Sequence, residues 1–202
     1  MRAGSARVHR ETESTPFVSA LMEGRVGRAG YGYYLLRLRH VYADLERHLR
    51  EHAGHPAVAA VWDPALERLR AIDADLGHWL PERPSLRSAA VTAYRERLAH
   101  AARRPHLLVA HHYTRYLGDL AGGQVIGSAL SRHHGVRDRG LAFYDFAHLG
   151  SPVHYRRRYR ERLDRLPLDD ARRDEVVEEV VAAFELNRRL LRELGDELLP
   201  ST

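Results

Sequence analysis

Apolar residues recur at helical spacing along almost the whole chain. The stretch 31–53 shows the pattern well, because its apolar side chains fall three or four residues apart and so share one helix face. These positions are Leu35, Leu38, Val41, Tyr42 and Leu45. No stretch shows the alternation of β-branched and polar residues that is typical of strands. The pattern therefore predicts an all-α protein.

Glycine, proline and capping residues predict where these helices begin and end. Asp63-Pro64 and Ser151-Pro152 each pair an N-capping side chain with proline at the first helical position. Gly24 closes the first helix, and Gly54 with Pro56 stops the second. We expect helices over 5–22, 31–53, 64–79, 86–103 (capped by Ser85) and 105–134, another from 152, and a last one from 169 or 170 to 195.

The composition predicts one domain over residues 1–202, since neither a repeat nor a low-complexity linker divides the chain. The absence of cysteine excludes disulfides and thiolate chemistry. No apolar run approaches the roughly 18 residues that span a bilayer, and the first residues lack the apolar segment of a signal peptide. We therefore expect a cytoplasmic protein that does not enter a membrane.

The chain is basic, with a net charge of +5, and all 32 of its basic Lys or Arg positions are arginine. A GC-rich coding sequence explains that bias. Charges of both signs are interleaved, which is typical of solvated helix faces. Only 156-RRRYRER-162 gathers positive charge in one stretch, so we expect no nucleic-acid partner.

The helical stretch 107–130 holds Gly118, Gly122 and Gly123 in the middle of its run. Each costs roughly 1 kcal/mol relative to alanine, or about 3 kcal/mol together. Gly118 and Gly122 are four residues apart and share a face, which lets a flat ligand or another backbone approach closely. Three explanations stay open from the glycines alone: a ligand site, a helix end followed by a new helix, or close helix–helix packing.

The string around these glycines, 111-HHYTRYLGDLAGGQ-124, closely resembles the distal-helix signature of the haem oxygenases. Ala121 departs from it, where a serine is common. Weaker matches extend the resemblance over about 5–195; they are 40-HVYADLE-46, 105-PHLLVAHHY-113, 140-GLAFYDF-146, 155-YRRRYRERLD-164 and 183-AFELN-187. The resemblance implies a single-domain helical fold that holds haem between a proximal N-terminal helix and a kinked, glycine-rich distal helix.

The segment 8-VHRETESTPF-17 resembles the proximal helix of that family. The resemblance assigns the axial iron ligand to His9 and a supporting role to Glu13. Glu13 lies four residues on, hence on the same helix face, and a metal-bound imidazole usually donates its second N–H to a carboxylate or a carbonyl. A His9–Glu13 pair on the surface is the alternative.

The resemblance also assigns the residues that contact the rest of the haem. Arg156 and Arg160 match the basic residues that hold the haem propionates, and arginine binds a carboxylate through two parallel donors. Tyr113 matches a hydroxyl on the propionate side. The remaining haem contacts are assigned to Gly118, Gly122, Gly123 and Phe184.

Asp119, Tyr42, Arg115 and Asn187 match the residues that order water on the oxygen side of the haem in that family. Asn187 has separate support, because it lies between Phe184 and Leu191 on an otherwise apolar stripe. A buried amide needs hydrogen-bond partners, and ordered water can supply them.

The resemblance implies that haem is both cofactor and substrate. Its ring would be opened at a meso carbon to biliverdin, carbon monoxide and ferrous iron, with O₂ and electrons from an external donor. We expect that donor to be acidic, of the ferredoxin or flavodoxin type, because arginines surround the propionate side.

Two other functions stay open. One is a haem carrier or sensor on the same fold without turnover. The other is a non-haem di-iron oxygenase, which needs repeated Glu-x-x-His pairs on facing helices. The nearest pairs are Asp75-x-x-His78 and Asp145-x-x-His148.

Overall fold

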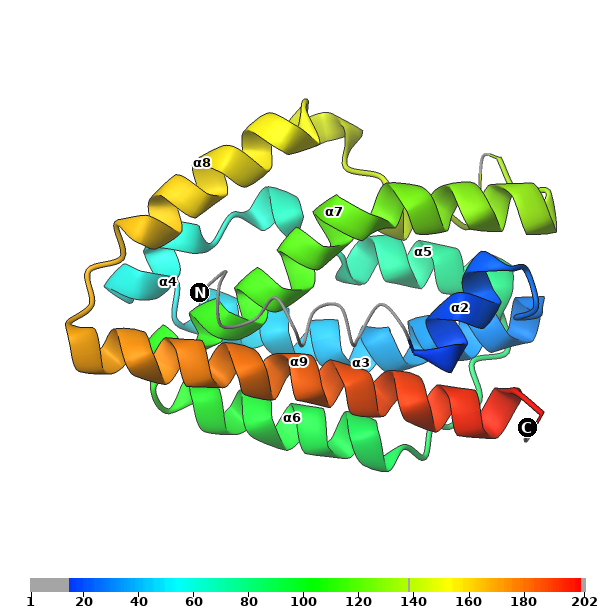
Figure 1. Ribbon diagram of the computed structural model, residues 1–202, viewed down its shortest axis with the longest axis horizontal. Helices are drawn as coiled ribbons and strands as arrows, with labels where there is room; N and C mark the ends of the chain where they lie inside the picture. Colours follow the sequence, from blue (N-terminus) through cyan, green and yellow to red (C-terminus); the bar gives the residue numbers. More distant parts are fainter. Residues whose placement is uncertain (1–14, 138, 201–202) are drawn as a thin grey trace.

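The computed structural model describes residues 15–137 and 139–200, and within them every regular element is a helix (Figure 1). The all-α prediction is confirmed. The α-helices are α2 (Pro16–Met22), α3 (Arg28–Glu51), α4 (Pro56–Val61), α5 (Leu69–Trp79), α6 (Ala89–Ala102), α7 (Leu108–His134), α8 (Pro152–Asp164) and α9 (Asp170–Leu198). Short 3₁₀ turns, η1 (Pro64–Leu66), η2 (Pro105–Leu107), η3 (Ala142–Tyr144) and η4 (Ala147–Leu149), connect them.

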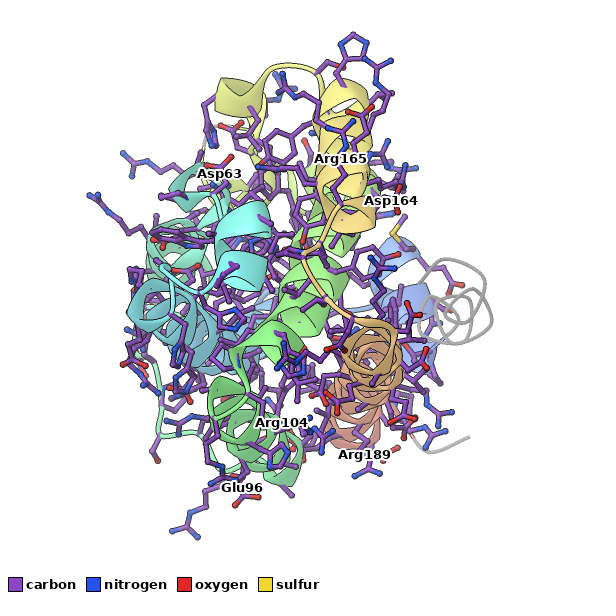
Figure 2. The ribbon with its side chains drawn as sticks, turned by 90° about the vertical axis from the view of Figure 1, so that its left-hand side faces the viewer. Asp63, Glu96, Arg104, Asp164, Arg165 and Arg189 are labelled. Atoms are coloured by element: carbon purple, nitrogen blue, oxygen red, sulfur yellow. The ribbon has the colours of Figure 1, made fainter. Side chains whose placement is uncertain are left out.

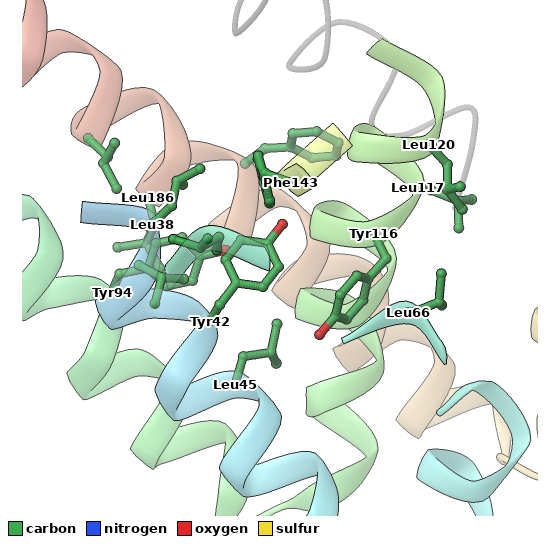
Figure 3. Close-up of a cluster of buried hydrophobic side chains, with 14 of the residues drawn as sticks. Leu38, Tyr42, Leu45, Leu66, Tyr94, Tyr116, Leu117, Leu120, Phe143 and Leu186 are labelled. Atoms are coloured by element: carbon green, nitrogen blue, oxygen red, sulfur yellow. The ribbon is translucent and has the colours of Figure 1, made fainter. Parts of the chain in front are cut away.

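Helix α7 runs through the middle of the molecule and packs against α3 and α9 on one side and against α4 and α8 on the other (Figure 1). One continuous cluster of buried apolar side chains fills the space between them. Figure 3 shows Tyr42 of α3 and Tyr116 of α7 at its centre, with Phe143 above Tyr42. The Tyr42 ring meets both neighbours edge to face, at centroid distances of 5.7 Å to Tyr116 and 5.6 Å to Phe143.

Side chains of both charges cover the outside, as the interleaved sequence predicts. Figure 2 shows Glu96, Arg104 and Arg189 along α6 and α9, and Asp164 with Arg165 at the end of α8. Several are paired between elements: Arg104 donates to Glu175 at 2.5 Å and Arg95 to Asp44 at 2.7 Å. Within the described residues, no helix combines the length and the apolar character that crossing a membrane requires.

Local signals set several helix ends where the sequence predicts them. The carboxylate of Asp169 accepts from the Arg172 N–H at 2.8 Å and caps α9. Ser151 caps α8 in the same way, with Pro152 as its first residue. Gly135 ends α7 with φ of +67°, a conformation that favours glycine.

Other helix starts differ from the prediction. A continuous helix over 5–22 is wrong, because Thr15 is extended and α2 begins at Pro16; proline disfavours the helical conformation of the residue before it. Pro56 stops one helix but is also the first residue of α4, which the sequence analysis missed. Asp63-Pro64 opens only the turn η1.

Distant carboxylates explain where α5 and α6 begin. Glu46 of α3 accepts from the backbone N–H groups of Arg68 at 2.6 Å and Leu69 at 3.0 Å, so it supplies the N-terminal acceptor for α5. Glu193 of α9 accepts from the Ala90 N–H at 2.9 Å and from the Ser88 hydroxyl. The predicted start after Ser85 is therefore wrong by three residues.

Helix α7 stays helical through all of its glycines, so a break into two helices at 118–123 is excluded. Its ribbon nevertheless changes direction between the two halves (Figure 1). The bend accords with the kinked glycine-rich helix that the resemblance implies.

Candidate active site

The four residues assigned to the oxygen side lie together, although they come from three helices. Arg115 and Asp119 are one turn apart on α7, Tyr42 projects from α3 and Asn187 from α9. The Tyr42 hydroxyl donates to Oδ2 of Asp119. Arg115 donates from Nε to the Tyr42 hydroxyl at 3.3 Å and from Nη1 to Oδ1 of Asn187 at 2.5 Å. The structure thus brings these four predicted residues into one hydrogen-bond network.

Burial dominates the electrostatics of this network. It raises the pKa of Asp119, while the Arg115 guanidinium and the Tyr42 hydroxyl act in the opposite direction. Nη2 of Arg115 lies 3.9 Å from Oδ1 of Asp119, which is an ion pair without a direct hydrogen bond. Asp119 therefore keeps an oxygen with free lone pairs and a raised affinity for a proton, which suits a group that holds water and passes protons.

The glycines of α7 differ in what surrounds them. At Gly118 and Gly122, an added Cβ would meet no described residue within 4 Å outside their own helix, so the described part of the chain leaves their backbone uncovered there. At Gly123, a Cβ would stand 2.6 Å from Cδ1 of Tyr144. Gly118 and Gly122 therefore suit contact with a flat ligand, whereas Gly123 is needed for the close approach of Tyr144.

Two of the three residues assigned to the propionates lie on α8, which packs against α7. Arg156 is half-buried, and its Nε has no hydrogen-bond partner among the described residues. Arg160 is exposed one turn further along. Tyr113 of α7 is half-buried next to α8, where it contributes to raising the pKa of Tyr159. A cationic side chain with a buried, unpartnered nitrogen, on a helix that packs against the helix with the open glycine backbone, fits a flat ligand with carboxylates, as haem is.

The assigned proximal residues, His9 and Glu13, lie outside the described residues. Phe17, which follows them in the matched segment, is fully buried in the core. Phe184 of α9 is also buried, at 6% exposure. The roles of His9, Glu13 and Phe184 stay predictions.

A second buried network, which the sequence analysis missed, lies two turns before Asp119 on α7. His111 shares a 2.8 Å hydrogen bond with Oε1 of Glu179 on α9, and Arg97 of α6 donates to both oxygens of that carboxylate. These hydrogen bonds hold the pKa of Glu179 down to about 2, against the effect of burial. No sequence signal links three helices at separations of 68 and 82 residues, so this group could not be found from spacing.

A third unpredicted contact joins α7 to α8. The ring of His112 stacks on Tyr159 at 5.4 Å between centroids and 3° between planes, and Nδ1 shares a 2.6 Å hydrogen bond with the Tyr159 hydroxyl. Burial lowers the pKa of His112 to about 3. This histidine is neutral at working pH and packs α8, the helix of Arg156, against α7.

The carboxylates and histidines considered for a di-iron site are engaged elsewhere. Asp75 accepts from the backbone N–H groups of Ala142 and Phe143 at 2.9 and 2.8 Å, and Asp145 accepts from the Ala147 N–H. Within the described part of the chain, no three side chains of the metal-binding types gather closely enough to hold an ion.

Known proteins match this chain over nearly its whole length. A family model described as "Heme oxygenase" matches residues 1–193. The chain is 33% identical to heme oxygenase 1 of a Nostoc species, over 98% of this chain and 86% of that protein. It is also 33% identical to heme oxygenase 1 of Homo sapiens, over 100% of this chain and 73% of that protein.

Solved structures agree. The fold superposes on the crystal structure of heme oxygenase-1 from a Synechocystis species in complex with heme with a TM-score of 0.92, at 32% identity, covering 98% of this chain and 91% of that one. Heme oxygenase-2 of the same source, in complex with heme and NO, gives 0.91 at 33% identity, over 97% of this chain and 84% of that one. Sequence and structure agree over the same span, and the chain belongs to the haem oxygenase family.

Proposed function

We propose that this chain opens haem oxidatively through the network of Tyr42, Arg115, Asp119 and Asn187. The chain is a haem oxygenase, an oxidoreductase that degrades haem to biliverdin. The reaction consumes O₂ and electrons from a reductant and also releases carbon monoxide and ferrous iron. The observation that carries the proposal is the meeting of all four oxygen-side residues in one buried network.

The residues present fit haem. Gly118 and Gly122 offer bare backbone to the flat ring. Arg156, whose buried Nε has no partner among the described residues, suits its propionates together with Arg160 and Tyr113. His9 would bind the iron, with Glu13 orienting its ring, and Gly123 and Phe184 would line the pocket. When bound, haem supplies the iron that activates oxygen and the ring that is oxidised.

The protein's contribution is to hold water and protons on the oxygen side. The Tyr42 hydroxyl occupies Oδ2 of Asp119, which leaves Oδ1 as an acceptor for water. Arg115 donates to the Tyr42 hydroxyl and to the Asn187 amide oxygen and so holds the donors and acceptors around Asp119 in place, which would orient water there. Burial raises the proton affinity of Asp119, which allows it to relay a proton through that water without itself approaching the ring.

The assignment of His9 is tested by absorbance. His9→Ala should lose the Soret and visible bands of the axially ligated haem complex, and added imidazole should restore them. His100→Ala on α6 is the matched control and should leave the spectrum unchanged. A normal spectrum in His9→Ala would assign the iron ligand to another residue.

The alternative of a haem carrier or sensor predicts binding without turnover. It gives no reason for Tyr42, Arg115, Asp119 and Asn187 to be held in contact, since haem affinity does not need them. A single-turnover assay for biliverdin with purified protein, haem and a chemical reductant separates the two functions. Stable haem without biliverdin would favour the carrier.

The electron donor is an acidic protein of the ferredoxin or flavodoxin type that docks beside the propionate edge. Arg157 and Arg158 on α8 extend the positive surface of Arg156 and Arg160, and Arg157 makes only a loose 3.9 Å contact with Glu161. Complementary charge raises the rate of encounter. Donor-supported turnover should slow steeply with salt, and Arg157→Glu with Arg158→Glu should slow it further.

The matched control reverses another adjacent pair of exposed arginines, Arg172 and Arg173 on α9. A small neutral reductant should support unchanged turnover in both double variants. If reversal on α8 leaves ferredoxin-supported turnover unaffected across a salt series, the donor docks elsewhere.

Two broader expectations stay predictions. A single domain over 1–202 predicts one unfolding transition by both circular dichroism and fluorescence. A cytoplasmic location predicts recovery in the cytosolic fraction after cell lysis.

A further inference from the structure

Three tyrosines gather beside Asp119 that no assignment covers. Tyr31 and Tyr34 are three residues apart on α3 and share a face, with ring centroids 6.0 Å apart. Tyr144 stands on η3 across from them. All three rings are buried, Tyr31 completely.

Two of their hydroxyls lack a hydrogen-bond partner. The Tyr31 and Tyr144 hydroxyls are shielded from solvent and make no hydrogen bond of normal geometry within the described residues. They lie close to each other, since a weak direct contact between the two hydroxyls is among the causes that shift the pKa of each, after burial. A buried hydroxyl without a partner is unfavourable, and an ordered water between polar groups is the usual remedy.

The fold holds Tyr144 firmly in this position. The Asp75 carboxylate binds the N–H groups of Ala142 and Phe143 and so fixes the turn that carries Tyr144. The Tyr144 ring then lies against Gly123, one helical turn beyond Asp119, where any side chain would collide with it. The cluster therefore lies directly along α7 from the Asp119 carboxylate.

The same three tyrosines are coupled to the network already described. The Asp119 carboxylate contributes to the raised pKa of each of them, which burial dominates. The Arg115 guanidinium opposes the rise for Tyr34. The charges of Asp119 and Arg115 thus act on these three tyrosines as well as on Tyr42.

We propose that the hydroxyls of Tyr31, Tyr34 and Tyr144 hold a buried water that continues the hydrogen-bond network of Asp119 along the glycine face of α7. The three tyrosines are positioning residues: each hydroxyl both donates and accepts, so together they orient the water without exchanging a bond with substrate. The inference rests on the proposed role of Asp119 in holding water on the oxygen side.

The shared water is tested without haem. Tyr31→Phe, Tyr144→Phe and the double variant form a double-mutant cycle in urea unfolding of the apoprotein. If one water serves both hydroxyls, each single change lowers the unfolding midpoint, and the second change costs less than the first. Tyr33→Phe, the neighbour on α3 that is less buried, is the control and should leave the midpoint unchanged.

If the hydroxyls hold no water, removing an orphaned hydroxyl leaves the midpoint equal or higher, and the two effects add. That result overturns the proposal. A direct check is a high-resolution structure of the apoprotein, in which density for a water should lie between the hydroxyls of Tyr31 and Tyr144.

The connection to Asp119 is tested in the ferric haem complex. The pH midpoint of its visible absorbance change should move by roughly half a pH unit in Tyr144→Phe and in Tyr34→Phe, because the hydrogen bonding of water on the oxygen side has changed. It should not move in Tyr33→Phe. In an Asp119→Ala background, Tyr144→Phe should give no further shift.

The outcomes distinguish this inference from the proposed function. Coupling in the apoprotein without a shift in the complex means a structural water only, and rejects the positioning role. Normal biliverdin formation by Asp119→Ala rejects the function of the network itself, while the apoprotein cycle still decides whether the tyrosines share water.

Discussion

Two buried carboxylates, Asp119 of α7 and Glu179 of α9, stand in similar surroundings, but their pKa values are shifted in opposite directions. Each lies near an arginine and an aromatic ring, and burial alone raises the pKa of both. The final pKa of Asp119 is raised, whereas that of Glu179 falls to about 2. Burial therefore does not explain the difference.

The partners explain it. Glu179 accepts from two nitrogens of the charged Arg97 guanidinium and shares a further hydrogen bond with His111, so its carboxylate is saturated. Asp119 accepts from one neutral hydroxyl and has its arginine 3.9 Å away. A saturated carboxylate stabilises the fold, and an unsaturated one retains the capacity to bind water and protons. Asp119 of α7 is thus the acid available for chemistry, whereas Glu179 of α9 is an acid that stabilises the fold.

The largest expected effect is on turnover in Asp119→Ala. Losing a positioned group that relays protons typically costs 100-fold or more, so biliverdin formation should fall on the order of 100- to 1,000-fold. Haem should still bind, because no assigned haem contact is removed. The assay is biliverdin per haem in single turnover, with Asp174→Ala on the exposed face of α9 as the control.

The pH dependence of unfolding in Asp119→Asn tests the comparison between Asp119 and Glu179. Because burial raises the pKa of Asp119, the folded state disfavours its charge, and that penalty is present above the ordinary pKa of 3.8. Asp119→Asn should therefore unfold at equal or higher urea concentration at pH 7, and the gain should vanish as the pH falls below 3.8. A large loss of stability at pH 7 in Asp119→Asn would show that Asp119, like Glu179, mainly stabilises the fold.

Glu179→Gln should have the opposite effect. A pKa lowered from 4.5 to about 2 corresponds to a contribution on the order of 3 kcal/mol at neutral pH. Because the folded pKa is depressed, this contribution is complete above pH 4.5 and is lost as the pH falls toward 2. Urea unfolding of wild type and variant over that range should show the difference shrinking. A constant difference would assign the loss to packing instead.

The sequence predicts both the α-helical fold and the Asp119 network, because each leaves a recognisable local pattern of residue types. The 3.6-residue period marks the helices, and 111-HHYTRYLGDLAGGQ-124 marks the network residues of α7. The saturated group of Glu179 and the caps of α5 and α6 depend on partners 22 to 105 residues away. Spacing cannot reveal such pairs, because any of the many Glu and Arg residues could form them.

Gly118→Ala should give a smaller effect, of about 1 kcal/mol, with opposite signs for folding and for binding. Alanine is favoured over glycine within a helix by that amount, and a Cβ there meets nothing within 4 Å. The apoprotein should therefore be more stable, while haem affinity, measured by titration, should fall. Gly123→Ala is the contrast: its Cβ would collide with Tyr144, so that variant should be destabilised.

The smallest expected effect is in Tyr94→Phe, which tests whether the two networks are independent. The Tyr94 ring lies 5.6 Å from His111. Burial raises the pKa of Tyr94 to about 12, Arg115 opposes the rise, and Glu179 and Asp119 both add to it. Its buried hydroxyl has no hydrogen-bond partner among the described residues, so removing it should change stability by less than about 0.5 kcal/mol. When Tyr94→Phe is combined with Glu179→Gln, the two effects on urea unfolding should add. Biliverdin formation by Tyr94→Phe should stay within about twofold of the wild type. A coupling energy above about 1 kcal/mol between Tyr94→Phe and Glu179→Gln would show that Tyr94 connects the Glu179 group to the Asp119 network. The two carboxylates would then have to be treated as one unit.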